Sequence, residues 1–96
     1  MTISVLYVDD DTDYHQIVSR FFEREEDLSV RLCSMAEDGL KALELEPFDV
    51  VVSDYQMPVM DGISLLKEVR NRYGRLPFIL FTGRGREEVA IQAINN

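Results

Sequence analysis

Three consecutive valines run into a carboxylate in the stretch Val50-Val51-Val52-Ser53-Asp54. β-Branched residues favour strands, and a short run that is apolar on both faces is typical of a strand buried in a parallel sheet. The run Ile3-Ser4-Val5-Leu6-Tyr7-Val8 has the same character and leads directly into Asp9-Asp10-Asp11. Each run therefore predicts a buried strand that carries acidic side chains at its C-terminal end.

Strand-like and helix-like segments alternate along the whole chain. Strands are expected at residues 2–8, 28–33, 49–53 and 77–81. Helices are expected from residue 11 or 12, from Ser34, from 61 to 74, and from 86 to 94, where apolar residues recur at helical spacing. The start at Ser34 rests on the capping-box spacing to Glu37, and Asp11 and Asp61 are interpreted as helix caps.

Four strands that alternate with helices predict parallel strands joined by right-handed helical crossovers. The expected fold is a doubly wound α/β sheet in one domain that spans residues 1–96. In open sheets of this kind, ligands bind beyond the carboxyl ends of the strands. Asp9 and Asp10 would lie beside Asp54 there if the first and third strands are neighbours, and a cation is expected to hold these carboxylates together.

Composition narrows the classes of function. The chain has 10 basic and 18 acidic residues and a net charge of -8. A surface that binds nucleic acid needs a cluster of basic residues, and none is visible in this sequence. The single cysteine, Cys33, rules out an internal disulfide and suits a reducing, cytoplasmic setting. No signal peptide and no apolar run of membrane-spanning length is recognised, so no membrane association is expected.

The ligand types favour magnesium as the cation. Oxygen-only ligands select a hard ion over zinc. The start of a calcium-binding EF-hand loop is imitated by Asp9-x-Asp11-x-Asp13, but Tyr14 stands where glycine is needed and Arg20 where the bidentate glutamate belongs. The only histidine, His15, is interpreted as a solvated helix position rather than a metal ligand or a catalytic group.

Three motifs resemble the receiver domain of two-component response regulators, of which the chemotaxis regulators are the familiar type. They are Val8-Asp9-Asp10-Asp11, the segment from Asp54 to Gly62 with its Met57-Pro58-Val59-Met60-Asp61-Gly62 run, and Phe81-Thr82-Gly83. Their order and spacing match the family over essentially the whole chain. The resemblance implies a flavodoxin-like sheet ordered 2-1-3-4. The segment 81–88 also resembles receivers in multidomain sensory proteins of archaea.

The resemblance implies a phosphoryl-accepting signalling domain rather than an enzyme. Asp54 would accept the phosphoryl group from a sensor histidine kinase or a phosphotransfer protein, and Thr82 would offer its hydroxyl to the arriving phosphoryl oxygen. Magnesium would be held by the side chains of Asp10 and Asp54, by the backbone carbonyl of Gln56, and by Asp9 through water. Gln56 and Arg84 would tune the lifetime of the phosphorylated state.

The chain departs from the family at its C-terminal end. Family members continue into a fifth strand with a lysine at its tip and a fifth helix, whereas this sequence stops at Asn96. Slow or undetectable phosphorylation of these 96 residues is therefore expected, with full activity only in the intact domain. An uncovered apolar strand at 77–82 also predicts self-association through that edge and the bare sheet face.

Two alternatives are kept open at this stage. Haloacid-dehalogenase phosphatases also place aspartates after a first strand and use magnesium. Their signature would run Asp9-x-Asp11-x and then threonine or valine, whereas this chain has Asp13 there. A pseudo-receiver, a binding module that never takes phosphate, would carry the same motifs. Detection of a labile phosphate after mixing with acetyl phosphate and magnesium would separate all three.

Overall fold

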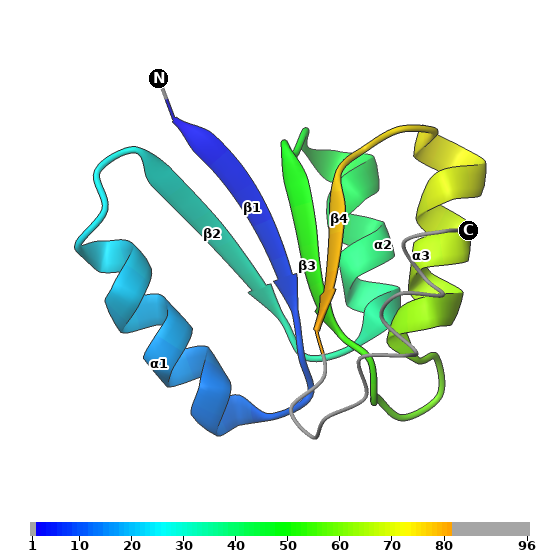
Figure 1. The fold of residues 1–96 in the computed structure, drawn as a ribbon, viewed down its shortest axis with the longest axis horizontal. Helices are drawn as coiled ribbons and strands as arrows, with labels where there is room; N and C mark the ends of the chain where they lie inside the picture. The colour runs from blue at the N-terminus through cyan, green and yellow to red at the C-terminus, as the bar shows by residue number, and fades with distance from the viewer. Residues whose placement is uncertain (1, 82–96) are drawn as a thin grey trace.

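The computed structural model describes residues 2–81 of the chain. Its elements alternate as expected (Figure 1): β1 (Ile3–Val8), α1 (Thr12–Glu23), β2 (Leu28–Cys33), α2 (Ala36–Leu45), β3 (Val50–Asp54), α3 (Gly62–Tyr73) and β4 (Phe78–Phe81). The helix expected at 86–94, Thr82 and Arg84 lie outside the described residues. In the described part, no helix is both long enough and apolar enough to cross a membrane.

The strands form one parallel sheet in the order β2-β1-β3-β4, which confirms the expected topology. Helix α1 covers one face of this sheet beside β2, and α2 and α3 cover the other face (Figure 1). The first and third strands are neighbours, with Val8 paired with Ser53. The carboxyl ends of β1 and β3 therefore meet at the same edge.

The core lies between the sheet and the α2–α3 layer. Its fully buried side chains include Leu6 and Val8 of β1, Val51 of β3, and Leu65 and Val69 of α3. Burial of side chains of this size is the main favourable contribution to folding, at about 2 kcal/mol each. This layer holds β1 and β3 in place beneath the residues that follow them.

Within residues 2–81, the opposite face of the sheet is less completely covered. The predicted apolar stripe does form α1, yet none of its residues is fully buried, and Ile17 and Phe21 are 62% and 56% exposed. The register places Tyr7, Val52 and Ile79 in one row across this face. Helix α1 packs mainly on β2, so Ile79 at the far end of that row is 56% exposed.

Two helix starts follow the sequence prediction and one does not. The side chain of Asp11 caps α1 by accepting from the Asp13 backbone N–H at 2.9 Å, and Asp61 caps α3 through the Ser64 N–H at 2.8 Å. The capping box at Ser34 was wrong, because the N-cap of α2 is Met35, which makes no side-chain cap hydrogen bond. Ser34 lies one residue too early, since Met35 still has extended backbone angles (φ -138°, ψ 149°).

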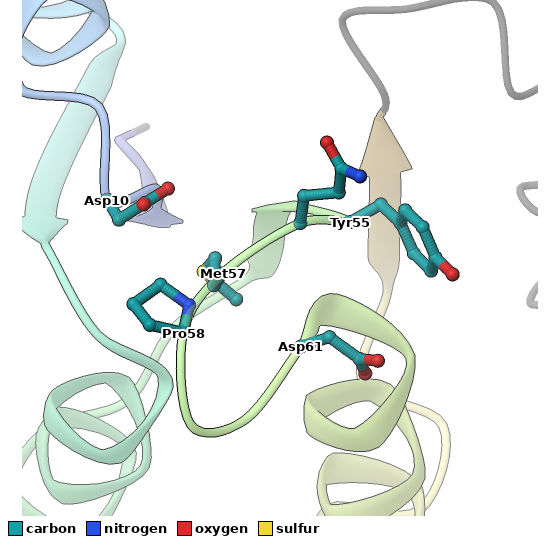
Figure 2. Close-up of a pocket in the computed structure, with 6 residues that line it drawn as sticks. Asp10, Tyr55, Met57, Pro58 and Asp61 are labelled. Atoms are coloured by element: carbon teal, nitrogen blue, oxygen red, sulfur yellow. The ribbon is translucent and has the colours of Figure 1, made fainter.

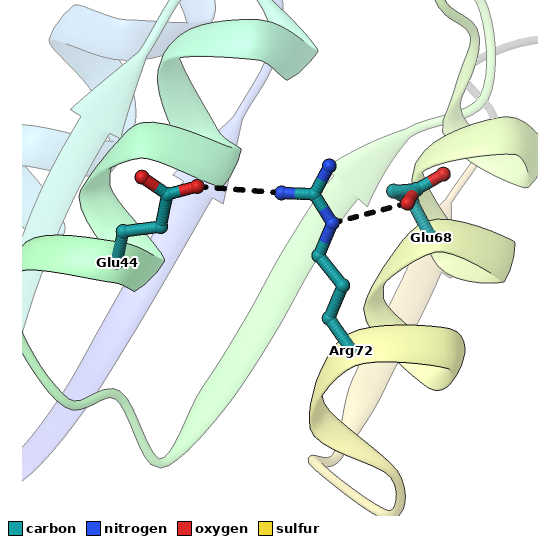
Figure 3. A network of polar contacts seen from close by, with 3 residues as sticks. All are labelled: Glu44, Glu68 and Arg72. Carbon is teal, nitrogen blue, oxygen red and sulfur yellow. Dashed lines mark hydrogen bonds and ion pairs between the residues drawn. The ribbon is translucent and has the colours of Figure 1, made fainter.

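The outer surface between α2 and α3 carries an ion-pair network (Figure 3). The Arg72 Nη1 atom lies 3.4 Å from Glu44 of α2, and its Nε donates to Glu68 of α3 at 3.0 Å. All three side chains are substantially exposed, so each pair is worth only about 0.5 kcal/mol. The apolar core, rather than this network, fixes the packing of the two helices.

Candidate functional site

Three carboxylates converge beyond the ends of β1 and β3. Asp9 and Asp10 directly follow β1, and Asp54 is the last residue of β3. One carboxylate oxygen from each of the three lies within 4.8 Å of the others. The structure therefore brings together the three acidic residues that the sequence placed at this edge, and parallel pairing of β1 with β3 is the cause.

The three carboxylates differ in their surroundings. Asp9 is only 1% exposed, Asp54 is half-buried and Asp10 is exposed. Asp9 is held by two donors: the Tyr7 hydroxyl donates to its Oδ2 at 3.1 Å, and the Asp11 backbone N–H donates to its Oδ1 at 2.9 Å. A buried charge needs such partners, so the Asp9 carboxylate has a fixed orientation.

The surroundings of Asp54 in this cluster shift the pKa of its carboxyl group. Burial, followed by the nearby charge of Asp9, raises the pKa of Asp54 above its ordinary value, and Asp10 adds to the effect. The backbone groups of Gln56 and Tyr55 act in the opposite direction. A cation between these carboxylates would relieve the repulsion, and an all-oxygen set of this kind fits a magnesium ion that keeps several of its waters.

Two hollows give access to the carboxylates. One, of about 540 Å³, is lined by Asp9, Asp10, Asp11, Tyr14, Asp54, Gln56 and Phe81. The other, of about 410 Å³, lies between Asp10 and the loop that follows β3 (Figure 2). Asp61 borders this second hollow from the start of α3, where its side chain serves as the helix cap. Gln56 lines both hollows and so borders the acidic cluster from the loop side.

The loop after β3 is held closed by its own backbone. The Gly62 N–H donates to the Tyr55 carbonyl at 2.8 Å, and the Met60 N–H donates to the Pro58 carbonyl at 2.8 Å. Val59 at the loop tip has φ 69°, which is an uncommon and strained conformation for a β-branched residue. These contacts keep Asp61 and the start of α3 close to the end of β3.

Two residues beside the cluster were missed by the sequence analysis. Tyr7 was treated only as part of a strand, and burial together with the charge of Asp9 raises its pKa, so the hydroxyl stays protonated and can donate. The solvated interpretation of His15 was wrong: its ring is half-buried, its Nε2 lies 2.5 Å from the Asp9 carbonyl oxygen, and it contacts Tyr7 edge-on. A tyrosine two residues before a buried aspartate was the available signal, because a buried hydroxyl requires a partner.

Comparison with known proteins decides the family. Residues 5–96 match the response regulator receiver domain. The chain belongs to this family. Receiver domains of response regulators are signalling domains of two-component systems rather than enzymes in the usual sense, as the sequence indicated.

Relatives and solved structures agree with this assignment. The chain is 41% identical to the DNA-binding transcriptional regulator NtrC of Proteus hauseri over 94% of this chain and 19% of that protein. It is 35% identical to the chemotaxis protein CheY-3 of Vibrio cholerae over 95% of this chain and 72% of that protein. The receiver domain of the Francisella response regulator 1452 superposes with a TM-score of 0.86 at 30% identity, covering 98% of this chain and 77% of that one. The chain thus spans about a fifth of the length of the regulators of the NtrC type.

Proposed function

We propose that Asp54 of this receiver domain accepts a phosphoryl group from a phosphohistidine on a sensor histidine kinase or a phosphotransfer protein. The observation that carries the proposal is the position of Asp54 at the end of β3, with a carboxylate oxygen within 4.8 Å of those of Asp9 and Asp10, in a hollow open to a donor. An Asp54 oxygen would attack phosphorus, an O–P bond would form, and the N–P bond of the donor would break as imidazole leaves.

Magnesium is the cofactor that the donor set fits. The side chains of Asp10 and Asp54, the backbone carbonyl of Gln56, and Asp9 through a water would hold it. When bound, the ion would supply positive charge that offsets the charge of the transferred phosphoryl group. Asp54 would provide the nucleophilic oxygen. Buried Asp9 would add a negative charge, and the hydrogen bonds from Tyr7 and Asp11 fix the orientation of its carboxylate.

Phosphorylation of the whole protein by acetyl phosphate tests this function. With magnesium, one acid-stable, base-labile phosphate per chain is expected, mapped to the peptide that contains Asp54. Without magnesium, or with excess chelator, uptake should fall to background because the three carboxylates then repel the phosphoryl oxygens. An adduct on Asp9 or Asp11 would instead favour the haloacid-dehalogenase alternative, and no adduct would favour a pseudo-receiver. Neither alternative is favoured by the family match.

An Asp10→Asn variant tests the metal site directly. Magnesium at about ten times its dissociation constant should stabilise the wild type by about 1.4 kcal/mol, which is a rise of about 5–10 °C in the melting temperature of a domain of this size. Most of that rise should be lost in Asp10→Asn, since one of three clustered charges is removed. Asp13→Asn, which removes an exposed charge outside the cluster, should keep the full rise. Equal rises in Asp10→Asn and the wild type would place the ion elsewhere.

Three further residue roles are proposed on the same basis. Thr82 would donate its hydroxyl to a phosphoryl oxygen, and Gln56 and Arg84 would tune access of the hydrolytic water. Gln56 borders both hollows at the cluster, which supports its part in this role. Thr82 and Arg84 follow Phe81, which itself lines the acidic hollow, and they lie outside the described residues.

We also propose that the 96-residue chain self-associates and that the domain works in the cytoplasm without binding nucleic acid. Exposed apolar side chains at Ile17, Phe21 and Ile79 support self-association. Light scattering over a dilution series measures it, and a monomer at every concentration would contradict it. The buried free thiol of Cys33 suits a reducing compartment.

A further inference from the structure

A buried tyrosine connects the acidic cluster to two neighbouring elements. Tyr7 of β1 is 6% exposed, and its hydroxyl donates to the Oδ2 atom of Asp9 at 3.1 Å. Its ring stacks on Phe81 at the end of β4, with centroids 5.8 Å apart and planes 20° from parallel. The His15 ring of α1 meets it edge-on at 6.0 Å. Tyr7 therefore has little freedom to turn away from Asp9.

The rigidity of Tyr7 matters because of what Asp9 requires. Asp9 is a 1% exposed carboxylate, and without donors it would carry a buried, unsatisfied charge. The Asp11 N–H occupies Oδ1 and the Tyr7 hydroxyl occupies Oδ2, and each oxygen keeps a second lone pair. The Nε2–H of His15 donates to the Asp9 main-chain carbonyl, since a carbonyl can only accept. Both the side chain and the main chain of Asp9 are thus fixed by their neighbours Tyr7, Asp11 and His15.

We propose that Tyr7 is a positioning residue of the proposed metal site: its ring packs against those of Phe81 and His15, and its hydroxyl holds the Asp9 carboxylate in the orientation that converges with Asp10 and Asp54. The inference rests on the proposed magnesium site, and it assigns a role that the receiver motif itself does not require of this position. Because each Asp9 side-chain oxygen accepts only one hydrogen bond, a second lone pair on each would remain for a metal-bound water. Groups that orient a metal-binding carboxylate in this way commonly contribute 10–100-fold to metal affinity.

The test compares magnesium affinity in variants of the full-length protein, measured by calorimetry or by metal-dependent melting. Tyr7→Phe keeps the stacked ring and removes only the hydroxyl, so the dissociation constant for magnesium should rise about tenfold. Phe81→Leu keeps the Tyr7 hydroxyl but removes the ring on which Tyr7 stacks. The dissociation constant for magnesium should therefore also rise, by less than in Tyr7→Phe. Tyr73→Phe is the matched control, because it removes a tyrosine hydroxyl from α3 and should leave the affinity unchanged.

The outcomes separate this inference from the proposed function. Magnesium binding by the wild type with an unchanged dissociation constant in Tyr7→Phe would overturn the role of Tyr7 and leave the metal site standing. No magnesium binding by the wild type would overturn both.

A measurement on the unsubstituted protein keeps the inference testable if a variant fails to fold. In NMR spectra of tyrosine-labelled protein, the Tyr7 ring signals should shift as the protein is saturated with magnesium, and the Tyr73 signals should not. An unmoved Tyr7 signal at saturation would also overturn the inference.

Discussion

An Asp54→Asn variant of the whole protein will take up no phosphate from acetyl phosphate, even with saturating magnesium. The amide oxygen is a far weaker nucleophile toward phosphorus than a carboxylate, and no described acidic side chain other than those of Asp9 and Asp10 shares the cluster. Asp61→Asn is the matched control, because Asp61 caps α3 and asparagine caps equally well. Uptake should be complete in the control and absent in Asp54→Asn, as counted by intact-protein mass spectrometry. Full uptake in Asp54→Asn would move the acceptor to another residue.

The same variant should be more stable than the wild type when no metal is present. Burial and the Asp9 charge raise the pKa of Asp54 in the folded state, so folding favours the protonated form of this carboxyl. At neutral pH the ionised group therefore lowers stability. That cost is lost as the pH falls from the raised pKa of the folded state to the ordinary pKa of the unfolded state, below which the group is protonated in both. Asp54→Asn removes the group, so its melting temperature at pH 7 should exceed that of the wild type in chelator, and the gap should close toward acid pH. Magnesium should reverse the order.

Much of this site could be predicted because strand ends are a property of local sequence. The four predicted strands agree with the observed ones to within one residue at each end. Once β1 and β3 are neighbours, parallel pairing alone brings Asp9 and Asp10 beside Asp54. The order of the strands came from the resemblance to receiver domains rather than from periodicity. The convergence of carboxylates thus needed both the local pattern and the topology.

The features that escaped prediction depend on contacts between elements. Tyr7 meets His15 from α1 and Phe81 from β4, and no spacing in the sequence encodes either contact. The exposure of Ile17 and Phe21 depends on how much of the sheet α1 covers, whereas helical periodicity reports only that one face is apolar. Ser34 failed as a cap for a different reason. The capping-box pattern specifies only the spacing between two side chains, whereas the backbone at Met35 is still extended, so the helix begins one residue later than the pattern implies.

Gly62→Ala will strongly destabilise the domain and weaken its metal site together. A Cβ atom at Gly62 would lie 2.2 Å from the Asp54 carbonyl oxygen and 2.6 Å from Cδ1 of Leu80. The Leu80 side chain can turn aside, but the Asp54 oxygen belongs to the backbone at the end of β3. Relief therefore requires α3 and β3 to move apart, which would also stretch the 2.8 Å hydrogen bond from Gly62 N–H to the Tyr55 carbonyl.

Overpacking of this kind costs about 3 kcal/mol, which for a domain of this size is a fall of more than about 10 °C in the melting temperature. Gly74→Ala provides a control without a clash: nothing lies within 4 Å of an added Cβ, but φ 63° with ψ -112° is a conformation that alanine rarely adopts, so backbone strain of about 1–3 kcal/mol is expected there with no displacement of α3 from β3. Chemical denaturation of the three proteins measures both values. Because the clash acts on the backbone of Asp54 itself, the folded fraction of Gly62→Ala should also bind magnesium more weakly, whereas Gly74→Ala should not. A wild-type magnesium affinity in the folded fraction of Gly62→Ala would mean that α3 is not anchored on the end of β3, and that the position of Asp54 is fixed by the sheet alone.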